Sequence, residues 1–372
     1  MKNLSLLIIL SFVAIQTASS QMAKGQINKI HVNSKATAHN LFGDKANQEV
    51  AVYLPPSYQS SDQKRYPVLY FLPGYYDKVD SWITKEHFQG LRLKESMDSL
   101  ITANIIKEMI VVVPNSYTFL EGSFYTNSSV NGDYETFYTE ELINHIDGNY
   151  RTLASNQSRA IAGHSMGGSG ALFLSMKHAD LYSIGYGLCS GLFADNWLDE
   201  CLLFTDTAQT RRFIALEERL SKLSREEAHA QYMQTMQSLE WYERFMYAYG
   251  TAFASDKSKK APYIQFPYSL DGDSLILDQD ILELWEQGFG NLEERVDKYQ
   301  DNLKSLKAYV VDGGKDDYFK YIRTGNTYYS DLLDWKGIPH TYILHDGDHS
   351  SKVRQQLEKS ILPLCSNLLE FE

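Results

Sequence analysis

Short apolar runs alternate with helix-like stretches along most of the chain. The runs are continuous, and several are closed by proline, glycine or charged residues, which is typical of strands buried on both faces of a parallel sheet. These predicted strands are residues 49–54, 67–72, 109–113, 158–162, 183–188, 306–311 and 340–344. Amphipathic or helix-prone stretches lie between or after them, at residues 135–150, 168–176, 318–335 and 350–370. This alternation predicts an α/β fold with a mostly parallel central sheet and helices on both faces.

The alternation is interrupted between about residues 192 and 300. Residues 217–236 are charged and helix-prone, 262–277 are irregular, and 282–302 return to a helical pattern. We interpret residues 192–300 as a helical cap inserted into a single domain that covers residues 21–372. The cap contains an aromatic cluster that is most simply explained as its core: Trp241, Tyr242, Phe245, Met246, Tyr247 and Tyr249.

The N-terminal segment has the pattern of a signal peptide. Lys2 precedes an apolar run at residues 4–13, which is too short to span a bilayer, and small residues follow at 18–20. We therefore expect residues 1–20 to be removed and the mature chain to start at Gln21. No cysteine lies near this point. These features predict a secreted or periplasmic protein without a stable membrane anchor.

Charge and cysteine content narrow the classes of partner. The formal net charge is −12 and no basic run is present, which argues against a nucleic-acid partner. The three cysteines, Cys189, Cys201 and Cys365, are too few for a disulfide framework and are expected to be free and buried. The sequence does not predict an oligomeric state.

The motif Gly-His-Ser-Met-Gly at residues 163–167 carries the clearest chemical signal. It follows a predicted strand and precedes a predicted helix, which is the context of a nucleophile elbow. A sharp turn would hold Ser165 in a strained backbone conformation, and the glycines would avoid clashes there. The sequence therefore predicts Ser165 as a nucleophile above the sheet.

A serine nucleophile needs a base, and the base needs an acid to orient it. Both types of residue follow the last two predicted strands, in the chain order serine, acid, histidine. We predict His349 as the base and regard His345, closer to its strand, as structural. Asp317 is the favoured acid and Asp316 the alternative, while Asp312 could simply cap the turn.

Two backbone N–H groups are expected to form an oxyanion hole. Met166 follows the nucleophile, and Tyr75 follows an early buried strand and Gly74. Aromatic residues near the predicted mouth are candidate substrate contacts: Tyr76, Phe124, Tyr125 and Tyr318. The acidic stretch at 271–280 lacks the ligand pattern of a calcium loop, so we predict neither a metal nor another cofactor.

Six segments together resemble the esterase D-like α/β-hydrolases. They are residues 52–58, 66–74, 122–127, 163–168, 314–317 and 347–349. This family includes feruloyl and acetyl-xylan esterases, siderophore esterases, S-formylglutathione hydrolases and mycolyltransferases. The resemblance implies an α/β-hydrolase fold and places the family's serine, acid and histidine on Ser165, Asp317 and His349. The chain departs from the family at Pro73, where a histidine often precedes the oxyanion glycine.

The resemblance also implies acyl transfer at a carboxylic ester or thioester. Together with the predicted export, this leads us to expect a serine esterase that acts on a small ester or on an acylated carbohydrate, such as a feruloyl or acetyl ester. An acyltransferase with the same triad and a non-catalytic carbohydrate-binding protein are the alternatives. The acyl group and the alcohol of the substrate cannot be predicted from these residues.

Overall fold

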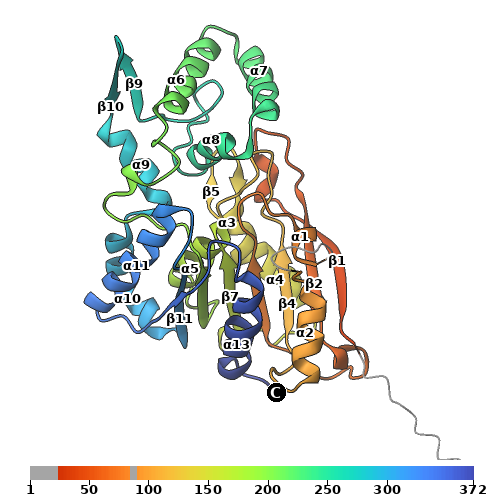
Figure 1. Ribbon diagram of the computed structural model, residues 1–372. Coiled ribbons are helices and arrows are strands. Elements are labelled where there is room, and N and C mark those ends of the chain that lie inside the picture. The colour runs from red at the N-terminus through yellow and green to blue at the C-terminus, as the bar shows by residue number, and fades with distance from the viewer. Residues whose placement is uncertain (1–23, 84–89) are drawn as a thin grey trace, which may run out of the picture.

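A computed structural model describes residues 24–83 and 90–372 and contains an eight-stranded sheet (Figure 1). The strand order is β1-β2-β4-β3-β7-β8-β11-β12. The strands are β1 (Gln26–Asn33), β2 (Asn47–Leu54), β3 (Val68–Leu72), β4 (Ile110–Pro114), β7 (Arg159–His164), β8 (Ile184–Leu188), β11 (Ala308–Gly314) and β12 (Thr341–His345). The pairs β1–β2 and β2–β4 are antiparallel, and every later pair is parallel. The predicted mostly parallel sheet is therefore confirmed.

The central strands are buried because their sequences are continuously apolar. Every residue of β3, β4, β7 and β8 is buried. Such strands need cover on both faces. Helices α2 (Leu93–Thr102) and α13 (Leu362–Leu368) lie in front of the sheet in Figure 1, and α5 (Met166–Lys177) packs on β7 and β8 from the opposite face.

The remaining helices of the sheet region follow the predicted alternation. A nearly continuous helical stretch includes α3 (Tyr134–Thr136) and α4 (Leu142–Asn149), where residues 135–150 were predicted to be helical. Helix α11 (Lys320–Trp335) connects β11 to β12, and α10 (Leu292–Ser305) contacts both α5 and α11. The short helices are α1 (Val79–Ile83) and α12 (Val353–Gln356).

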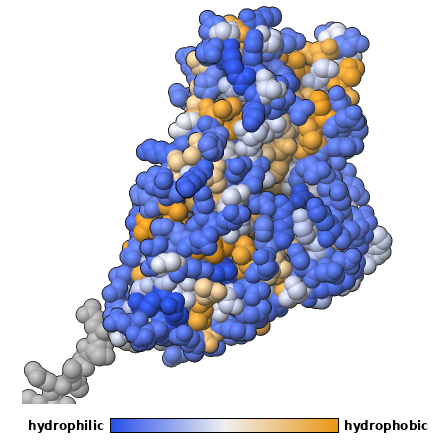
Figure 2. All heavy atoms as spheres, turned by 180° about the vertical axis from the view of Figure 1, so that it is seen from behind, coloured by the Kyte–Doolittle hydropathy of each residue, from blue (hydrophilic) through white to orange (hydrophobic). Residues whose placement is uncertain are grey.

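Most of the long connection between β8 and β11 lies above the sheet in Figure 1, and its last helix, α10, returns beside α11. It contains α6 (Thr207–Ser221), α7 (Arg225–Ser238), α8 (Trp241–Phe253), the hairpin β9 (Tyr268–Asp271) and β10 (Ser274–Leu277), α9 (Gln279–Phe289) and α10. The assignment of residues 192–300 as a cap stays a prediction. Figure 2 shows hydrophobic residues gathered near the top of the rear face, and the hairpin carries exposed Leu270, Ile276 and Leu277.

Three details of this connection differ from the sequence-based prediction. The helical stretch at 217–236 is divided between α6 and α7, because Ser224 and Glu227 form a capping box that starts a new helix. The stretch 262–277 is not wholly irregular, since it contains the β9–β10 hairpin. The stretch 282–302 is interrupted where Asn291 adopts a left-handed conformation.

The remaining predictions concern the cysteines and the N-terminus. Cys189, Cys201 and Cys365 are free and buried, as predicted. The predicted signal peptide at residues 1–20 lies outside the described residues. Within the described ranges, none of the helices has the length and apolar character that crossing a membrane requires.

Candidate active site

Ser165 sits on a strained turn between β7 and α5. Its backbone angles are φ 58° and ψ −119°, a region that costs a non-glycine residue about 1–3 kcal/mol. The surroundings hold this conformation, since the Ser165 N–H donates to the Leu188 carbonyl at 2.8 Å. A Cβ atom on Gly167 would lie 2.0 Å from the Leu72 carbonyl oxygen, so only glycine lets α5 approach β3 this closely. The predicted strand–turn–helix context of the serine is thus present.

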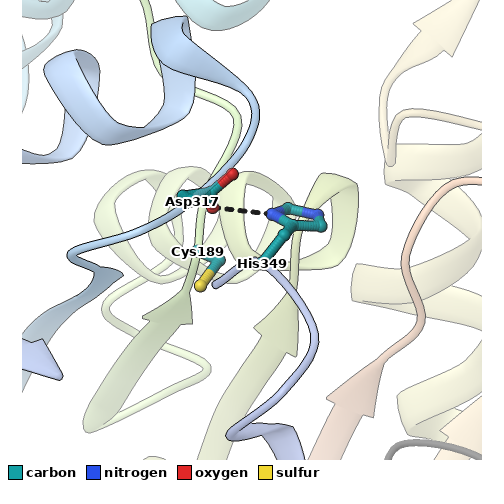
Figure 3. A group of neighbouring side chains, drawn as sticks. All are labelled: Cys189, Asp317 and His349. Carbon is teal, nitrogen blue, oxygen red and sulfur yellow. Dashed lines mark hydrogen bonds and ion pairs between the residues drawn. The ribbon is translucent and has the colours of Figure 1, made fainter. Parts of the chain in front are cut away.

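Ser165, His349 and Asp317 form a continuous hydrogen-bonded chain. His349 Nε2 lies 3.0 Å from Ser165 Oγ, and His349 Nδ1 lies 2.8 Å from Asp317 Oδ2. Figure 3 shows the second contact, with the Asp317 carboxylate facing the imidazole ring. Because a carboxylate only accepts, Nδ1 carries the proton and Nε2 is left free to accept the serine proton.

The strand topology explains why residues so distant in sequence meet here. β7, β8, β11 and β12 are parallel neighbours in the sheet, so their carboxyl ends lie along one edge. Ser165 follows β7, Asp317 follows β11 and His349 follows β12. This edge is where open α/β sheets place their ligand sites.

The structure also separates the two adjacent acids. Asp317 is buried, and its Oδ1 accepts a hydrogen bond from the Phe319 N–H at 2.9 Å while its Oδ2 faces His349. Asp316 is exposed. The geometry therefore favours Asp317 over Asp316 as the acid partner.

Two further histidines lie beneath the site. His164 Nε2 is 2.8 Å from the His349 carbonyl oxygen, and burial lowers the pKa of His164 to about 4. It is therefore a neutral donor that holds the His349 backbone. The His345 Nε2 atom lies 3.7 Å from Cys189 Sγ and 3.9 Å from Asp312 Oδ1. His345 thus belongs to the packing under the site, as its position near the strand predicted.

Asp312 carries a fully buried carboxyl within β11, so it does not cap the turn that follows the strand. It accepts hydrogen bonds from the Tyr186 hydroxyl and from Gln356 Nε2, the latter at 2.6 Å. Burial raises the pKa of Asp312 to about 7, and these hydrogen bonds oppose the shift only in part. The carboxyl thus supports the strand end and does not contact His349 in the way Asp317 does.

The raised pKa of Asp312 predicts a specific pH dependence of stability. Its native pKa, about 7, lies above the usual value of 3.8, so the native state holds this proton more tightly than the unfolded chain does. The Asp312 contribution to the free energy of unfolding should therefore fall as pH rises from about 4 to 7, by about 4 kcal/mol in total. Asp312→Asn should remove that slope in urea titrations at stepped pH. Asp316→Asn, on an exposed side chain of the loop after β11, should keep the wild-type slope. An unchanged slope in Asp312→Asn would contradict the prediction.

The residues of the two predicted oxyanion donors, Met166 and Tyr75, lie close to Ser165. Met166 is the first residue of α5, so its N–H precedes the intrahelical hydrogen bonds and is available to a ligand. The loop that carries Tyr75 also reaches the serine, since a Cβ on Gly74 would lie 3.4 Å from Ser165 Cβ. The Gly74 N–H donates to Asp77 Oδ2 at 3.1 Å, which shapes this loop without a histidine at position 73.

A cleft of about 280 Å³ opens over Ser165 and His349. Tyr76 and Tyr318 line it, as predicted from sequence, and both are exposed. The ring of Phe319 stands edge-on to His349 with centroids 4.9 Å apart, so aromatic residues flank the base as well as the cleft.

The structure places Phe124 and Tyr125 outside this cleft, on the wall of a separate pocket. Both are buried, and their positive φ values, 51° and 55°, accompany a turn that directs the side chains inward. Phe124 packs against Tyr75 and Phe245, and the Tyr125 hydroxyl donates to the Pro73 carbonyl at 2.6 Å. They support the Tyr75 loop from behind, and their role as substrate contacts stays a prediction.

Other cleft residues escaped the sequence reasoning. The long β8–β11 connection contributes Leu202, Trp241 and Phe245, and the α11 region adds Phe319 and Tyr321. The aromatic cluster at 241–249 was visible in the sequence but was interpreted as core. That is correct for Phe245, Met246, Tyr247 and Tyr249, whereas Trp241 and Tyr242 are 40% and 47% exposed.

One group of side chains in the described ranges has donor atoms close enough to hold a metal ion. Cys189, Asp317 and His349 place one donor atom each within 4.8 Å of one another (Figure 3). Burial raises the pKa of the Cys189 thiol, which disfavours the thiolate that a metal requires. Asp317 and His349 already bind each other, so the group fits a proton-transfer chain better than a metal centre. The acidic stretch near residue 272 forms the exposed turn of the β9–β10 hairpin.

Comparison with known proteins places these features in a family. The family model described as "Putative esterase" matches residues 45–248. The chain is 35% identical over 149 residues to an endo-1,4-beta-xylanase/feruloyl esterase of Xylanibacter ruminicola. The aligned region covers 39% of this chain and 19% of that protein. The chain is 30% identical over 182 residues to S-formylglutathione hydrolase of Mus musculus, covering 46% of this chain and 59% of that protein. The chain thus spans less than two thirds of these curated relatives.

A solved structure extends the likeness to the whole fold. A ferulic acid esterase superimposes with a TM-score of 0.61 over 94% of this chain and 100% of the other, at 21% sequence identity. This likeness concerns the fold alone and confirms the predicted α/β-hydrolase architecture.

Proposed function

The chain belongs to the family of putative esterases, and from this premise we propose that it hydrolyses carboxylic esters through Ser165, His349 and Asp317. The observation that carries the proposal is the pair of contacts on His349, 3.0 Å to Ser165 Oγ and 2.8 Å to Asp317 Oδ2. A base between a hydroxyl and a buried carboxylate is the arrangement that activates a serine.

The geometry supports a two-step acyl transfer. Ser165 Oγ attacks the acyl carbon while His349 Nε2 takes its proton, and Asp317 stabilises the resulting imidazolium. The oxyanion accepts hydrogen bonds from the N–H groups of Tyr75 and Met166. His349 then protonates the departing alkoxide, which leaves an acyl group on Ser165. Water, deprotonated by His349, attacks this acyl-enzyme. The bond from the acyl carbon to Ser165 Oγ then breaks, His349 returns the proton to Oγ, and the acid is released.

We assign the substrate to aromatic acyl esters of carbohydrates, with a feruloyl ester as the type. Exposed aromatic rings from three parts of the chain, Tyr76, Trp241 and Tyr318, line the cleft beside Ser165 and offer stacking surfaces. The feruloyl esterase named among the relatives supports the same assignment. Such substrates lie outside cells, which agrees with the export predicted from residues 1–20.

Labelling with a fluorophosphonate probe tests the catalytic part of this proposal. The probe should modify Ser165 and no other serine, as read by mass spectrometry of proteolytic peptides, and hydrolysis of p-nitrophenyl acetate should be lost in proportion. Activity that survives complete labelling of Ser165 would contradict the proposal.

Trp241 provides a test of the substrate assignment. Trp241→Ala removes one aromatic wall, so kcat/KM for methyl ferulate should fall about tenfold, the scale of a lost aromatic contact and its buried area. The small acetyl group of p-nitrophenyl acetate should be less affected, so the ratio of the two kcat/KM values should change. Trp335→Ala, at a 71% exposed tryptophan outside the cleft, is the matched control. Equal losses on both esters would argue against an aromatic acyl site.

A further inference from the structure

The loop that carries the predicted oxyanion donor is held by two backbone hydrogen bonds. The Glu121 carbonyl accepts the Tyr76 N–H at 2.9 Å, and the Gly74 carbonyl accepts the Asp77 N–H at 3.3 Å. The first bond fixes the peptide plane after Tyr75 and the second fixes the plane before it. Since the second plane contains the Tyr75 N–H, the two bonds together set the direction of that donor.

Glu121 is therefore hydrogen-bonded directly to the loop that carries the predicted oxyanion donor. Its backbone conformation is unfavourable unless neighbouring contacts stabilise it. Its φ is 70°, in the left-handed region that disfavours residues with side chains. The carbonyl oxygen of its neighbour Leu120 accepts a hydrogen bond from the Tyr75 hydroxyl at 3.1 Å. The segment 120–121 thus contacts both aromatic residues of the loop.

Arg244 of α8 forms an ion pair with Glu121 across 123 residues of sequence. The side chains are 17% and 4% exposed, so the pair is largely removed from water. Arg244 also donates to the Met236 carbonyl at 3.1 Å, which fixes it to the end of α7. Breaking a buried pair from one side is costly because the remaining charge loses its partner.

The same helix reaches the loop by two further contacts. Phe245 stands edge-on to the Tyr75 ring with centroids 5.1 Å apart. The Tyr75 hydroxyl is also 3.5 Å from the Trp241 carbonyl. Trp241, Arg244 and Phe245 therefore place one turn of α8 against the cleft and against the loop that shapes it.

We propose that Arg244 is a positioning residue for the oxyanion hole: its ion pair holds Glu121, and the Glu121 carbonyl holds the Tyr75–Tyr76 turn. This inference rests on the proposed esterase function and deepens it. It assigns to the β8–β11 connection a part in stabilising the transition state, in addition to lining the cleft.

The test compares Arg244→Met with Arg244→Lys and Glu121→Gln. Arg244→Met should lower kcat for p-nitrophenyl acetate by about 10- to 100-fold with KM changed less than about threefold, because a misplaced donor affects the transition state more than the bound ester. The affinity for a boronic acid, which mimics the tetrahedral intermediate, should fall by a similar factor. Arg244→Lys should retain most of the wild-type kcat, because lysine keeps the charge of the ion pair. The double variant Arg244→Met/Glu121→Gln should show a kcat no lower than that of the worse single variant.

Arg212→Met is the matched control, since Arg212 of α6 forms more exposed ion pairs, with Asp206 and with Glu243 of α8, and its removal should leave kcat unchanged. Equal kcat and equal boronate affinity in wild type and Arg244→Met would overturn the inference. So would a loss of kcat that is accounted for wholly by the fraction of unfolded Arg244→Met, as measured by a thermal melt. If Arg244→Met does not fold, Glu121→Gln provides the same comparison. Failure of the proposed function would look different, because the wild type itself would then lack Ser165-dependent hydrolysis.

Discussion

Replacing Ser165 with alanine is expected to lower kcat/KM for p-nitrophenyl acetate by about 10⁵- to 10⁶-fold, the scale seen when a triad nucleophile is removed. The loss should be this large because Ser165 Oγ is the atom that His349 Nε2 faces at 3.0 Å. Without it no acyl-enzyme forms, and only the oxyanion donors and substrate binding remain to assist direct attack by water. Initial-rate kinetics at several enzyme concentrations would measure the effect.

Ser175→Ala is the matched control for this experiment. Ser175 lies on the same helix, α5, and its hydroxyl donates to the Ala171 carbonyl within that helix. Its removal should leave kcat/KM within about twofold, in keeping with the modest net worth of one local hydrogen bond. Ser165→Ala that retained more than a few per cent of wild-type activity would contradict the assignment of the nucleophile.

The parts of the fold that sequence predicted are those in which local pattern decides structure. Strands β3 and β4 were visible because each is a short continuous apolar run, a composition that suits a strand covered on both faces. The edge strand β1 pairs only with β2, mixes polar and apolar residues and has no such run, so no pattern marked its bounds.

The candidate triad was predictable for a related reason. Its three residues each follow a recognisable strand, and parallel topology brings the ends of adjacent strands together. The choice between Asp316 and Asp317 was not predictable to the same degree, because it depends on which side chain the turn after β11 directs inward.

Tyr76 and Tyr318 were found from the sequence, but the rest of the cleft lining could not be predicted because it depends on long-range packing. Phe124 and Tyr125 lie in a loop whose sequence does not reveal the positive φ values that direct both rings inward. Arg244 and Glu121 are far apart in sequence and have no pattern in common. Such contacts become visible only when the β8–β11 connection is placed over the sheet.

Asp317→Asn is the variant that tests the acid, and kcat/KM should fall by about 10⁴-fold. The asparagine has nearly the shape of the aspartate, so the loop and the hydrogen bond from the Phe319 N–H should persist. Its amide, however, can donate to His349 Nδ1, which favours the tautomer with the proton on Nε2 and leaves no lone pair to accept the Ser165 proton. The imidazolium formed during the reaction also loses its counter-charge.

Asp316→Asn separates this effect from a general change in the loop's charge. It removes the same charge from the adjacent, exposed position, so kcat/KM should stay within about twofold to threefold of wild type, as for most exposed substitutions. A large loss in Asp316→Asn with a small loss in Asp317→Asn would reverse the assignment. Comparable losses in both would mean that the loop acts through its overall charge and that the 2.8 Å contact between Asp317 and His349 does not orient the base. The two carboxylates differ by one position and by burial, so this pair of variants measures directly what the turn after β11 contributes to catalysis.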